Sequence, residues 1–281
     1  MKLFIITSPT QKTTNDLIVT ACENRRIEYE LLDPDFTAPS DIKCNTSDMV
    51  YRVTDSFHYG HLELEHHLAS RGVVSFYKND ALPFTMNAEE IDSILLPELG
   101  VATPKTVNYI PKERSALLKC VDYLGGFPII IKALGGSHGV GVMKIDSRQS
   151  LFSVGDYLRK QGGMFVMKEF CNVTSTARLI VLGDKVIDSI EYTANTGDFR
   201  SNEGIEPNVA PKKFSKEVEE LAIKATHALG LEFGGVDIMI TSEGLKVAEV
   251  NFPCFFSRCQ MITGIDIAGM MVDYLVAKSN S

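Results

Sequence analysis

The hydrophobic and polar positions of the first 80 residues alternate in short blocks. Buried strands are predicted at the brief apolar runs 3–7, 29–32, 49–53 and 73–77. Helices are predicted at residues 15–25 and 61–70, where the apolar spacing is helical. Because strands and helices alternate, we expect a small open parallel sheet that ends near Pro83.

The pattern from about residue 85 onward predicts a second, larger block of helices and strands. Its helices are predicted at residues 88–99, 112–124, 150–160, 215–230 and 267–277. Its strands are predicted at residues 105–109, 127–133, 140–145, 164–170, 177–182, 185–192, 236–240 and 245–250. The sequence therefore predicts an α/β (α+β) protein with two domains, residues 1–84 and 85–281.

Composition and charge exclude several classes of protein. The 281 residues are 44% hydrophobic and 23% charged, which is enough apolar content for a core and argues against disorder. A net charge of −8 gives no basic surface for nucleic acid. The six cysteines form no C-x-x-C pair, and the apolar runs are too short for a signal peptide core or a membrane span. We expect a cytoplasmic protein that binds small anions and neither nucleic acid nor membrane.

A glycine-rich segment, IIIKALGGSHGVGV, follows a predicted apolar strand. Lys132 ends that strand, and the glycines after it are Gly135, Gly136, Gly139 and Gly141. Glycines let backbone N–H groups converge on an anion, and a lysine adds a positive charge for phosphate. The spacing matches neither a P-loop nor a Rossmann glycine motif. A strand follows, so the segment predicts a flap over phosphates, with a purely structural turn as the alternative.

Two predicted strands near the C-terminus carry acidic and amide side chains. Asp237 lies in GGVDIMI, and Glu249 and Asn251 lie in the following EVN. Glu249 and Asn251 are two residues apart, so both side chains project from the same face of a strand. Oxygen donors gathered on one face among apolar neighbours suit Mg²⁺ that bridges phosphates. The alternative, polar residues on a wet hairpin end, fits the apolar surroundings less well.

These motifs, with others in the same order, resemble the RimK-type ATP-grasp ligases. The shared blocks run from about residue 73 to the C-terminus: IIIKALGGSHGVGV, MFVMKEF, ARLIVLGDKVIDSIEY, GDFRSN, GGVDIMI, EVN and TGIDIAG. The family includes RimK-like alpha-L-glutamate ligases and lysine-biosynthesis carrier-protein ligases. The resemblance implies a pre-ATP-grasp domain at residues 1–84 and an ATP-grasp domain at 85–281. The latter would divide into a lid-like subdomain of about 105–170 and a C-terminal subdomain of about 171–281.

The resemblance also implies a site for ATP. Lys132 would contact the phosphates, and the flap of residues 135–141, which includes Ser137, would close over them. Adenine would be held at a hinge formed by Lys168, Glu169 and Phe170, with the Glu169 side chain reaching adenine or the ribose. Thr176 stands near the ribose, where the family has an aspartate.

The reacting end of the site follows from the same resemblance. Arg178 and Arg200 would face the γ-phosphate and the developing acyl phosphate, with Ser201 and Asn202 in support. Mg²⁺, or Mn²⁺ as an alternative, would be bound by Asp237, Glu249 and Asn251. A substrate carboxylate would attack the γ-phosphate, and an amine would then displace phosphate to form an amide.

The chain departs from the family at positions that bear on activity and substrate. Asn87 and Ala88 replace an Asp-Lys pair whose lysine contacts phosphate. After EVN the chain reads FPCFFSR, in which Phe252, Phe255 and Phe256 would form an apolar substrate wall and Arg258 would anchor a carboxylate. The alternative is that these phenylalanines pack in the core. The wall suggests an acceptor other than a ribosomal-protein tail, such as a peptide or an amino acid with an apolar part. The tail of a carrier or precursor protein is a further expected substrate.

Three functions remain open from the sequence. The first is a carboxylate–amine ligase that works as a homodimer or homotetramer, as its family often does. The second is a nucleotide-binding regulator that has lost turnover, which Ala88 and Thr176 favour. The third is a phosphotransferase that stops at a phosphorylated product. The retained arginines and metal ligands favour the ligase, and a requirement of ADP release for an added amine would discriminate between them.

Overall fold

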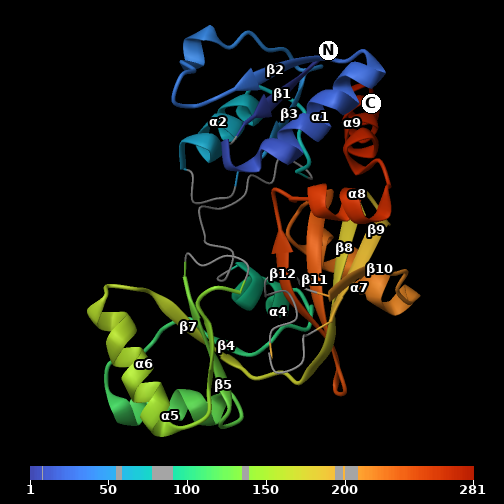
Figure 1. Ribbon diagram of the computed structural model, residues 1–281. Coiled ribbons are helices and arrows are strands. Elements are labelled where there is room, and N and C mark those ends of the chain that lie inside the picture. Colours follow the sequence, from blue (N-terminus) through green and yellow to red (C-terminus); the bar gives the residue numbers. More distant parts are fainter. Residues whose placement is uncertain (8, 55–58, 78–90, 135–138, 194–198, 200–207) are drawn as a thin grey trace.

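The computed structural model describes residues 1–7, 9–54, 59–77, 91–134, 139–193, 199 and 208–281. In these residues the strands form sheets of three, five and four strands, which occupy the top, middle and lower left of Figure 1. The mixture of helices and sheets confirms the predicted α/β class. No helix in the described part of the chain combines the length and apolar character that crossing a membrane requires.

The N-terminal sheet is parallel, as predicted. Its order is β2-β1-β3, and its strands are β1 (Lys2–Ile6), β2 (Glu28–Leu32) and β3 (Met49–Arg52). Leu3 and Ile5 of β1 face a cluster that includes residues of α1 (Lys12–Arg25), whereas Phe4 and Ile6 face residues of α2 (Tyr59–Ser70). Because helices cover both faces, β1 is a continuous apolar run without polar alternation.

The prediction of a strand at residues 73–77 is wrong. The structure has only two isolated bridges there, a parallel one from Val74 to Met49 and an antiparallel one from Tyr77 to Leu231. The segment passes from the edge of the N-terminal sheet to the C-terminal part of the chain, so it pairs with two partners in turn and never forms a ladder. Two short 3₁₀ helices, η1 (Pro9–Gln11) and η2 (Pro39–Asp41), complete this region.

The lower sheet in Figure 1 is antiparallel and lies next to two helices. Its order is β4-β7-β5-β6, and its strands are β4 (Thr106–Val107), β5 (Ile129–Ala133), β6 (Val142–Ile145) and β7 (Phe165–Glu169). The helices α5 (Arg114–Tyr123) and α6 (Arg148–Lys160) share an apolar core with its strands. A capping box of Ser147 and Ser150 begins α6. We call these strands and helices the lid unit.

The five-stranded sheet is also antiparallel, and one of its faces packs against a helix. Its order is β10-β9-β8-β11-β12, and its strands are β8 (Val173–Leu182), β9 (Lys185–Thr193), β10 (Asn208–Pro211), β11 (Phe233–Thr241) and β12 (Gly244–Asn251). Leu179, Val236 and Val247 pack with Ala222 of α7 (Lys216–Ala228). Alternation along the strands leaves Arg178, between Ala177 and Leu179, on the opposite face.

Other segments differ from the prediction in detail. The helix predicted at residues 88–99 starts outside the described residues and appears as a π-helical turn, η3 (Ile91–Leu95), followed by α4 (Leu96–Glu98). Neither β10 nor the short helix α8 (Ser257–Thr263) was predicted. The C-terminal helix α9 (Ile267–Ser279) was predicted, and in Figure 1 it lies beside α1.

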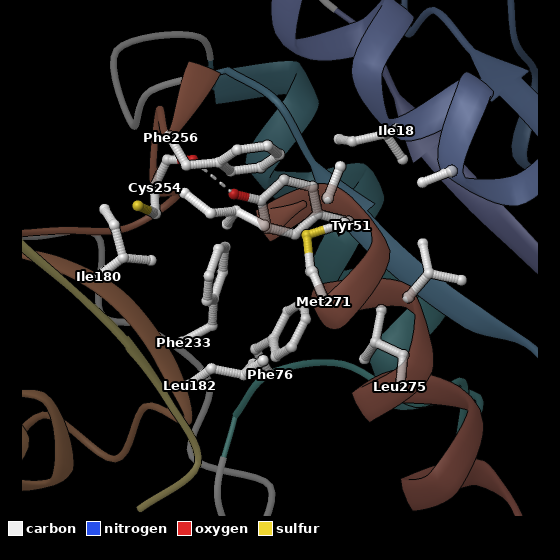
Figure 2. Packing of buried hydrophobic residues seen from close by; sticks show 14 of the residues in the cluster. Ile18, Tyr51, Phe76, Ile180, Leu182, Phe233, Cys254, Phe256, Met271 and Leu275 are labelled. Atoms are coloured by element: carbon white, nitrogen blue, oxygen red, sulfur yellow. Dashed lines mark hydrogen bonds between the residues drawn. The ribbon is translucent and has the colours of Figure 1, made fainter. Parts of the chain in front are cut away.

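One hydrophobic cluster joins the N-terminal sheet to the five-stranded sheet. Figure 2 shows aromatic rings from both regions meeting at its centre, with Tyr51 and Phe76 on one side and Phe233 and Phe256 on the other. The Tyr51 hydroxyl donates a 2.9 Å hydrogen bond to the backbone oxygen of Cys254. This bond fixes the segment that follows β12 against the N-terminal sheet. The boundary expected at residue 84 lies outside the described residues and stays a prediction.

Candidate nucleotide and metal site

The predicted metal ligands lie side by side on the face of the five-stranded sheet that is opposite α7. Register pairs Asp237 of β11 with Arg178 of β8 on one side and with Glu249 of β12 on the other. Arg178 donates from Nη1 to Asp237 Oδ2 at 2.7 Å. Asn251 Nδ2 lies 2.9 Å from Glu249 Oε1 and 3.3 Å from Asp237 Oδ2. The structure thus brings together the four residues that the sequence assigned to one centre.

A β-bulge shapes this face of β12. Asp237 pairs with Glu249 but the next residue, Ile238, pairs with Val247, so Ala248 is the extra residue. As a result Val247 and Val250 both pack on the α7 side, although they are three residues apart. Lys246 and Glu249 are then both directed to the opposite face, which regular alternation would not allow.

Burial controls the charge of this cluster. The side chains of Arg178 and Asp237 are only 12% and 15% exposed. Burial raises the pKa of Asp237 to about 7, an effect that Arg178 opposes and Glu249 reinforces. For Glu249, burial also raises the pKa, but Lys132, Asn251 and Arg178 together bring it below its usual value. A cation that approached both carboxylates would therefore compete with a proton on Asp237.

Lys132 reaches the cluster from the lid unit. It lies on β5, and its Nζ is 3.8 Å from Glu249 Oε2. Beyond β5 the chain returns through Gly139 and Gly141, both of which have positive φ angles. A Cβ on Gly141 would come within 3.2 Å of the Ala133 Cβ, so the turn also needs glycine for space. The remaining flap residues assigned from the sequence, Gly135, Gly136 and Ser137, lie outside the described residues.

The predicted hinge residues lie at the end of β7. Glu169 accepts hydrogen bonds on Oε1 from the backbone N–H of Lys105 at 2.8 Å and from Lys246 Nζ at 2.5 Å. Lys168 pairs within the lid sheet with Thr106 and Ile130. The Glu169 carboxylate therefore has two partners that the sequence pattern did not indicate. The expected contact of this side chain with adenine or ribose stays a prediction.

The structure also describes Phe170 of the predicted hinge and Thr176 of the predicted ribose site. The ring of Phe170 has Lys144 Nζ at 4.6 Å from its centroid. Thr176 is buried on β8, where it pairs with Met239 and Tyr192.

The expected substrate wall divides between core and surface. Phe256 is fully buried and lies 6.0 Å from Phe233 between ring centroids, so for this residue the packing alternative is correct. Phe252 is partly buried and contacts the Tyr77 ring at 5.1 Å. Phe255 is also partly buried. Figure 2 shows Phe256 directed into the cluster beside Tyr51.

Arg258 lies on α8 close to Tyr192 of β9. Its guanidinium is 5.4 Å from the centroid of the tyrosine ring. Burial raises the pKa of Tyr192, against the lowering effects of Arg258 and Arg178, so both arginines lie near this ring. The expected anchor is thus next to the cluster. Arg200, Ser201 and Asn202, like Asn87 and Ala88, lie outside the described residues.

The structure also reveals a residue whose part in the site the sequence did not indicate. Gly235 lies under Arg178: a Cβ at this position would be 2.7 Å from Arg178 Nη2 and 2.9 Å from Cys254 Sγ. The position therefore has no room for a side chain while Arg178 keeps its bond to Asp237. The glycine pair in GGVDIMI was a visible signal, but its second member could be interpreted only after Arg178 was placed.

The donors fit a hard divalent cation. Two carboxylates and one amide converge on one face, and oxygen ligands of this kind suit Mg²⁺. Within the described residues no group of three His, Cys, Asp or Glu side chains forms a metal site, in keeping with an asparagine as the third ligand here. The arrangement can hold a cation between two carboxylates, with Arg178 and Lys132 nearby for anionic oxygens.

Comparisons with known proteins identify the family of this chain. Residues 92–275 match the family model described as "RimK-like ATP-grasp domain". A "Probable alpha-L-glutamate ligase" of Citrobacter koseri is 32% identical over 205 residues, covering 72% of this chain and 67% of the relative. A "Ribosomal protein bS6--L-glutamate ligase" of Escherichia coli is 31% identical over the same shares of both chains.

The fold of the whole chain is similar to solved ATP-grasp structures. The ATP-grasp ligase PsnB, complexed with a minimal precursor, superposes with a TM-score of 0.72 over 98% of this chain and 99% of its own, at 17% identity. Fold and site together define an ATP-grasp enzyme. The chain belongs to the RimK-like ATP-grasp family, as its motifs predicted. It is an ATP-dependent carboxylate–amine ligase, an enzyme that forms carbon–nitrogen bonds.

Proposed function

We propose that this ligase activates a carboxylic acid as an acyl phosphate at the Arg178–Asp237 cluster and transfers the acyl group to the amine of an amino acid or peptide. The observation that carries the proposal is the convergence of Asp237, Glu249 and Asn251 on one face of β11 and β12, with Lys132 facing them from the lid unit. The carboxylates and the amide would thus bind the metal of a nucleoside triphosphate, and the lysine would bind its phosphates.

Mg²⁺ would be held by Asp237, Glu249 and Asn251. Asn251 donates through Nδ2 to both carboxylates, and a half-turn of its amide would present the oxygen instead. When bound, the ion would neutralise charge on the phosphates. Mn²⁺ accepts the same oxygen ligands and would substitute for it.

The cationic side chains would position the phosphates. Lys132, which now lies 3.8 Å from Glu249, would contact a phosphate oxygen once Glu249 turned to the metal. Arg178 is held by Asp237 and would face the γ-phosphate. The family motif GDFRSN supports a matching role for Arg200, with Ser201 and Asn202 beside it. These cationic side chains would stabilise the negative charge that develops in the transition state more than they stabilise the charge of the ground state.

The chemistry balances without a covalent enzyme intermediate. An oxygen of the substrate carboxylate would attack the γ-phosphorus and release ADP. The amine nitrogen would then attack the acyl carbon and displace phosphate, losing its proton as the amide forms. Cys254 and Cys259 would not act as nucleophiles, because burial raises the pKa of each thiol to about 12.

The acceptor is best sought among peptides and amino acids. One relative is named as a ligase for ribosomal protein bS6 and L-glutamate, and PsnB was solved with a precursor. In this chain the partly buried Phe255 and Arg258 beside Tyr192 support an acceptor with an apolar part and a carboxylate. A carrier-protein or precursor tail that carries both groups would fit. We further infer a cytoplasmic enzyme that forms a homodimer or homotetramer, as expected from its family.

ADP release tests this function directly. Wild-type protein would be incubated with ATP, Mg²⁺ and pools of amino acids and peptides, beside the double variant Asp237→Asn, Glu249→Gln. We expect release that needs both an acid and an amine and that the double variant lacks. Glu243→Gln is the matched control, because Glu243 is exposed in the turn between the same two strands.

Three other outcomes would contradict the proposal. Release without an amine would indicate a phosphotransferase. ATP binding without release in any pool would indicate a regulator. Release unchanged in the double variant would place the reaction elsewhere.

A further inference from the structure

Two ion pairs in the described residues join the lid unit to β12. In the first, the lysine comes from the lid unit: Lys132 of β5 lies 3.8 Å from Glu249. In the second, the lysine comes from β12: Lys246 Nζ lies 2.5 Å from Oε1 of Glu169 on β7. The two contacts start only three residues apart on β12, so this strand faces both the phosphate-binding lysine and the hinge.

The bulge at Ala248 makes the second contact possible. If β12 alternated regularly through Ala248, Lys246 would lie on the same side of β12 as Val250 and would point toward α7. Because Ala248 bulges out of this alternation, Lys246 shares the face of Glu249 and reaches the lid unit. Bulges often redirect a side chain next to an active site. The local geometry of β12 therefore serves Lys246 as well as the metal ligands.

Glu169 links three segments of the chain, at residues 105, 169 and 246. Its Oε1 accepts from Lys246 and from the backbone N–H of Lys105, while its own backbone N–H donates to the Lys105 oxygen at 3.0 Å. The side chains of Lys246 and Glu169 are only 23% and 16% exposed, so water screens this pair less than it screens a surface pair. Loss of the lysine would leave a largely buried carboxylate whose Oε1 keeps the backbone N–H of Lys105 as a donor.

We propose that Lys246 is a positioning residue for the nucleotide: it fixes the hinge at residues 168–170 at a set spacing from the metal ligand Glu249. This inference rests on the proposed function, in which phosphates lie at Lys132 and the base lies at the hinge. A ligand that spans both ends needs the correct spacing. A ligand that occupies only the phosphate end does not.

Calorimetric titration with two probes separates these cases. Mg-ATP spans both ends of the site, whereas Mg-tripolyphosphate occupies the phosphate end alone. In Lys246→Met we expect the affinity for Mg-ATP to fall about tenfold, as loss of one charge-assisted hydrogen bond implies, and the affinity for Mg-tripolyphosphate to change less than about twofold. Lys246→Arg should restore most of the Mg-ATP affinity, because it keeps the positive donor.

Two controls make the result specific. Lys185→Met removes an exposed lysine from the same sheet and should bind both probes as the wild type does. In Glu169→Gln the partner of Lys246 loses its charge, so adding Lys246→Met to this variant should cost less than it costs alone. Equal weakening of both probes by Lys246→Met, or unchanged Mg-ATP binding, would overturn the positioning role.

A measurement without ligand distinguishes failure of this inference from failure of the proposed function. Amide hydrogen exchange in nucleotide-free protein reports on the Lys105 N–H, which Glu169 holds. We expect Lys246→Met to speed exchange at this amide, whereas Lys185→Met should not. Unchanged exchange would overturn the inference even if ATP binds. If the wild type binds no Mg-ATP but Lys246→Met still speeds exchange at the Lys105 amide, the proposed function and the nucleotide role of Lys246 are both overturned. The pair of Lys246 and Glu169 would then be a structural contact alone.

Discussion

The five-stranded sheet and the lid unit contribute to the same site in different ways. In the five-stranded sheet the charged groups are register neighbours: Arg178, Asp237 and Glu249 follow one another across three hydrogen-bonded strands. In the lid unit Lys132 and Glu169 reach the site through ion pairs to β12. Strand register holds the charged groups of the five-stranded sheet in place whenever that sheet is folded. The positions of Lys132 and Glu169 depend in addition on how the lid unit packs against β12. This difference separates residues that we propose bind the metal from residues that we propose position the nucleotide.

The largest expected effect comes from Lys132, the lysine of the lid unit that we propose contacts phosphate. Lys132→Met removes the cation that would contact a phosphate, so kcat/KM for ATP should fall by about 10²- to 10³-fold. Steady-state ADP release measures this. Lys144→Met, on the neighbouring strand of the lid sheet, is the control and should stay within about tenfold of wild type. A Lys132→Met enzyme with wild-type kcat/KM would remove the lid unit from catalysis.

The next effect tests how tightly the five-stranded sheet is built. Gly235→Ala places a methyl 2.7 Å from Arg178 Nη2 and 2.9 Å from Cys254 Sγ, so Arg178 or the 252–256 segment must shift. We expect a loss of about 1–3 kcal/mol in the free energy of unfolding, together with reduced ADP release. Gly234→Ala is the matched control, because its Cβ would meet Thr226 and Val250 at 3.4 Å or more. Equal effects of both variants would show that Arg178 has more room than the structure indicates.

The third effect is a pH dependence that belongs to the five-stranded sheet. The pKa of Asp237 is raised to about 7, so below this pH the carboxyl is mostly protonated and metal binding must release the proton. Affinity for Mg-nucleotide should therefore rise as pH increases from 6 to about 8 and then level off. Titrations in buffers of different ionisation enthalpy should detect proton release near pH 7. Affinity that does not change across this range would contradict the raised pKa.

The same shift predicts a stability trend in the metal-free protein. Because the folded pKa lies above the unfolded value of about 3.9, the folded state binds more protons between pH 4 and 7. The wild type should therefore lose stability relative to Asp237→Asn as pH rises through this window. Chemical unfolding of both proteins at several pH values would measure the difference, and a constant difference would contradict the shift.

The smallest expected effect concerns binding of the acceptor substrate and not the binding of ATP by the five-stranded sheet or the lid unit. Arg258→Ala removes a guanidinium that lies 5.4 Å from the Tyr192 ring centroid. We expect KM for the carboxylate-bearing substrate to rise about tenfold, as loss of a charged hydrogen bond implies, while KM for ATP stays the same. A change in KM for ATP alone would move Arg258 from the substrate side to the nucleotide side.

The sequence predicted the parts of the fold whose partners follow a local period. β1 to β3 and the two hairpins at β8–β9 and β11–β12 have apolar runs separated by turn residues. It failed at Val74 and Tyr77, because an apolar run does not reveal that its residues pair with different partners. It also missed β10, which carries Pro211 and has few apolar residues to form a recognisable strand.

The candidate site shows the same division. The spacing of Glu249 and Asn251 on one strand predicted that both lie on the same face. In the structure Asn251 Nδ2 is 2.9 Å from Glu249 Oε1. Lys246 could not be found in this way, because its place on that face depends on the bulge at Ala248. The fate of Phe256 was also undetermined, since an apolar residue after a strand fits a substrate wall and a core equally well.

The most direct test of the account is the position of the metal. Crystals of the protein with Mn²⁺ and a non-hydrolysable ATP analogue would be measured for anomalous scattering at the manganese edge. We predict a peak between Asp237 and Glu249, with ligand oxygens from both carboxylates and from Asn251 at about 2.2 Å. A peak bound by other residues, or a nucleotide bound away from Lys132 with no metal at this face of β11 and β12, would contradict it.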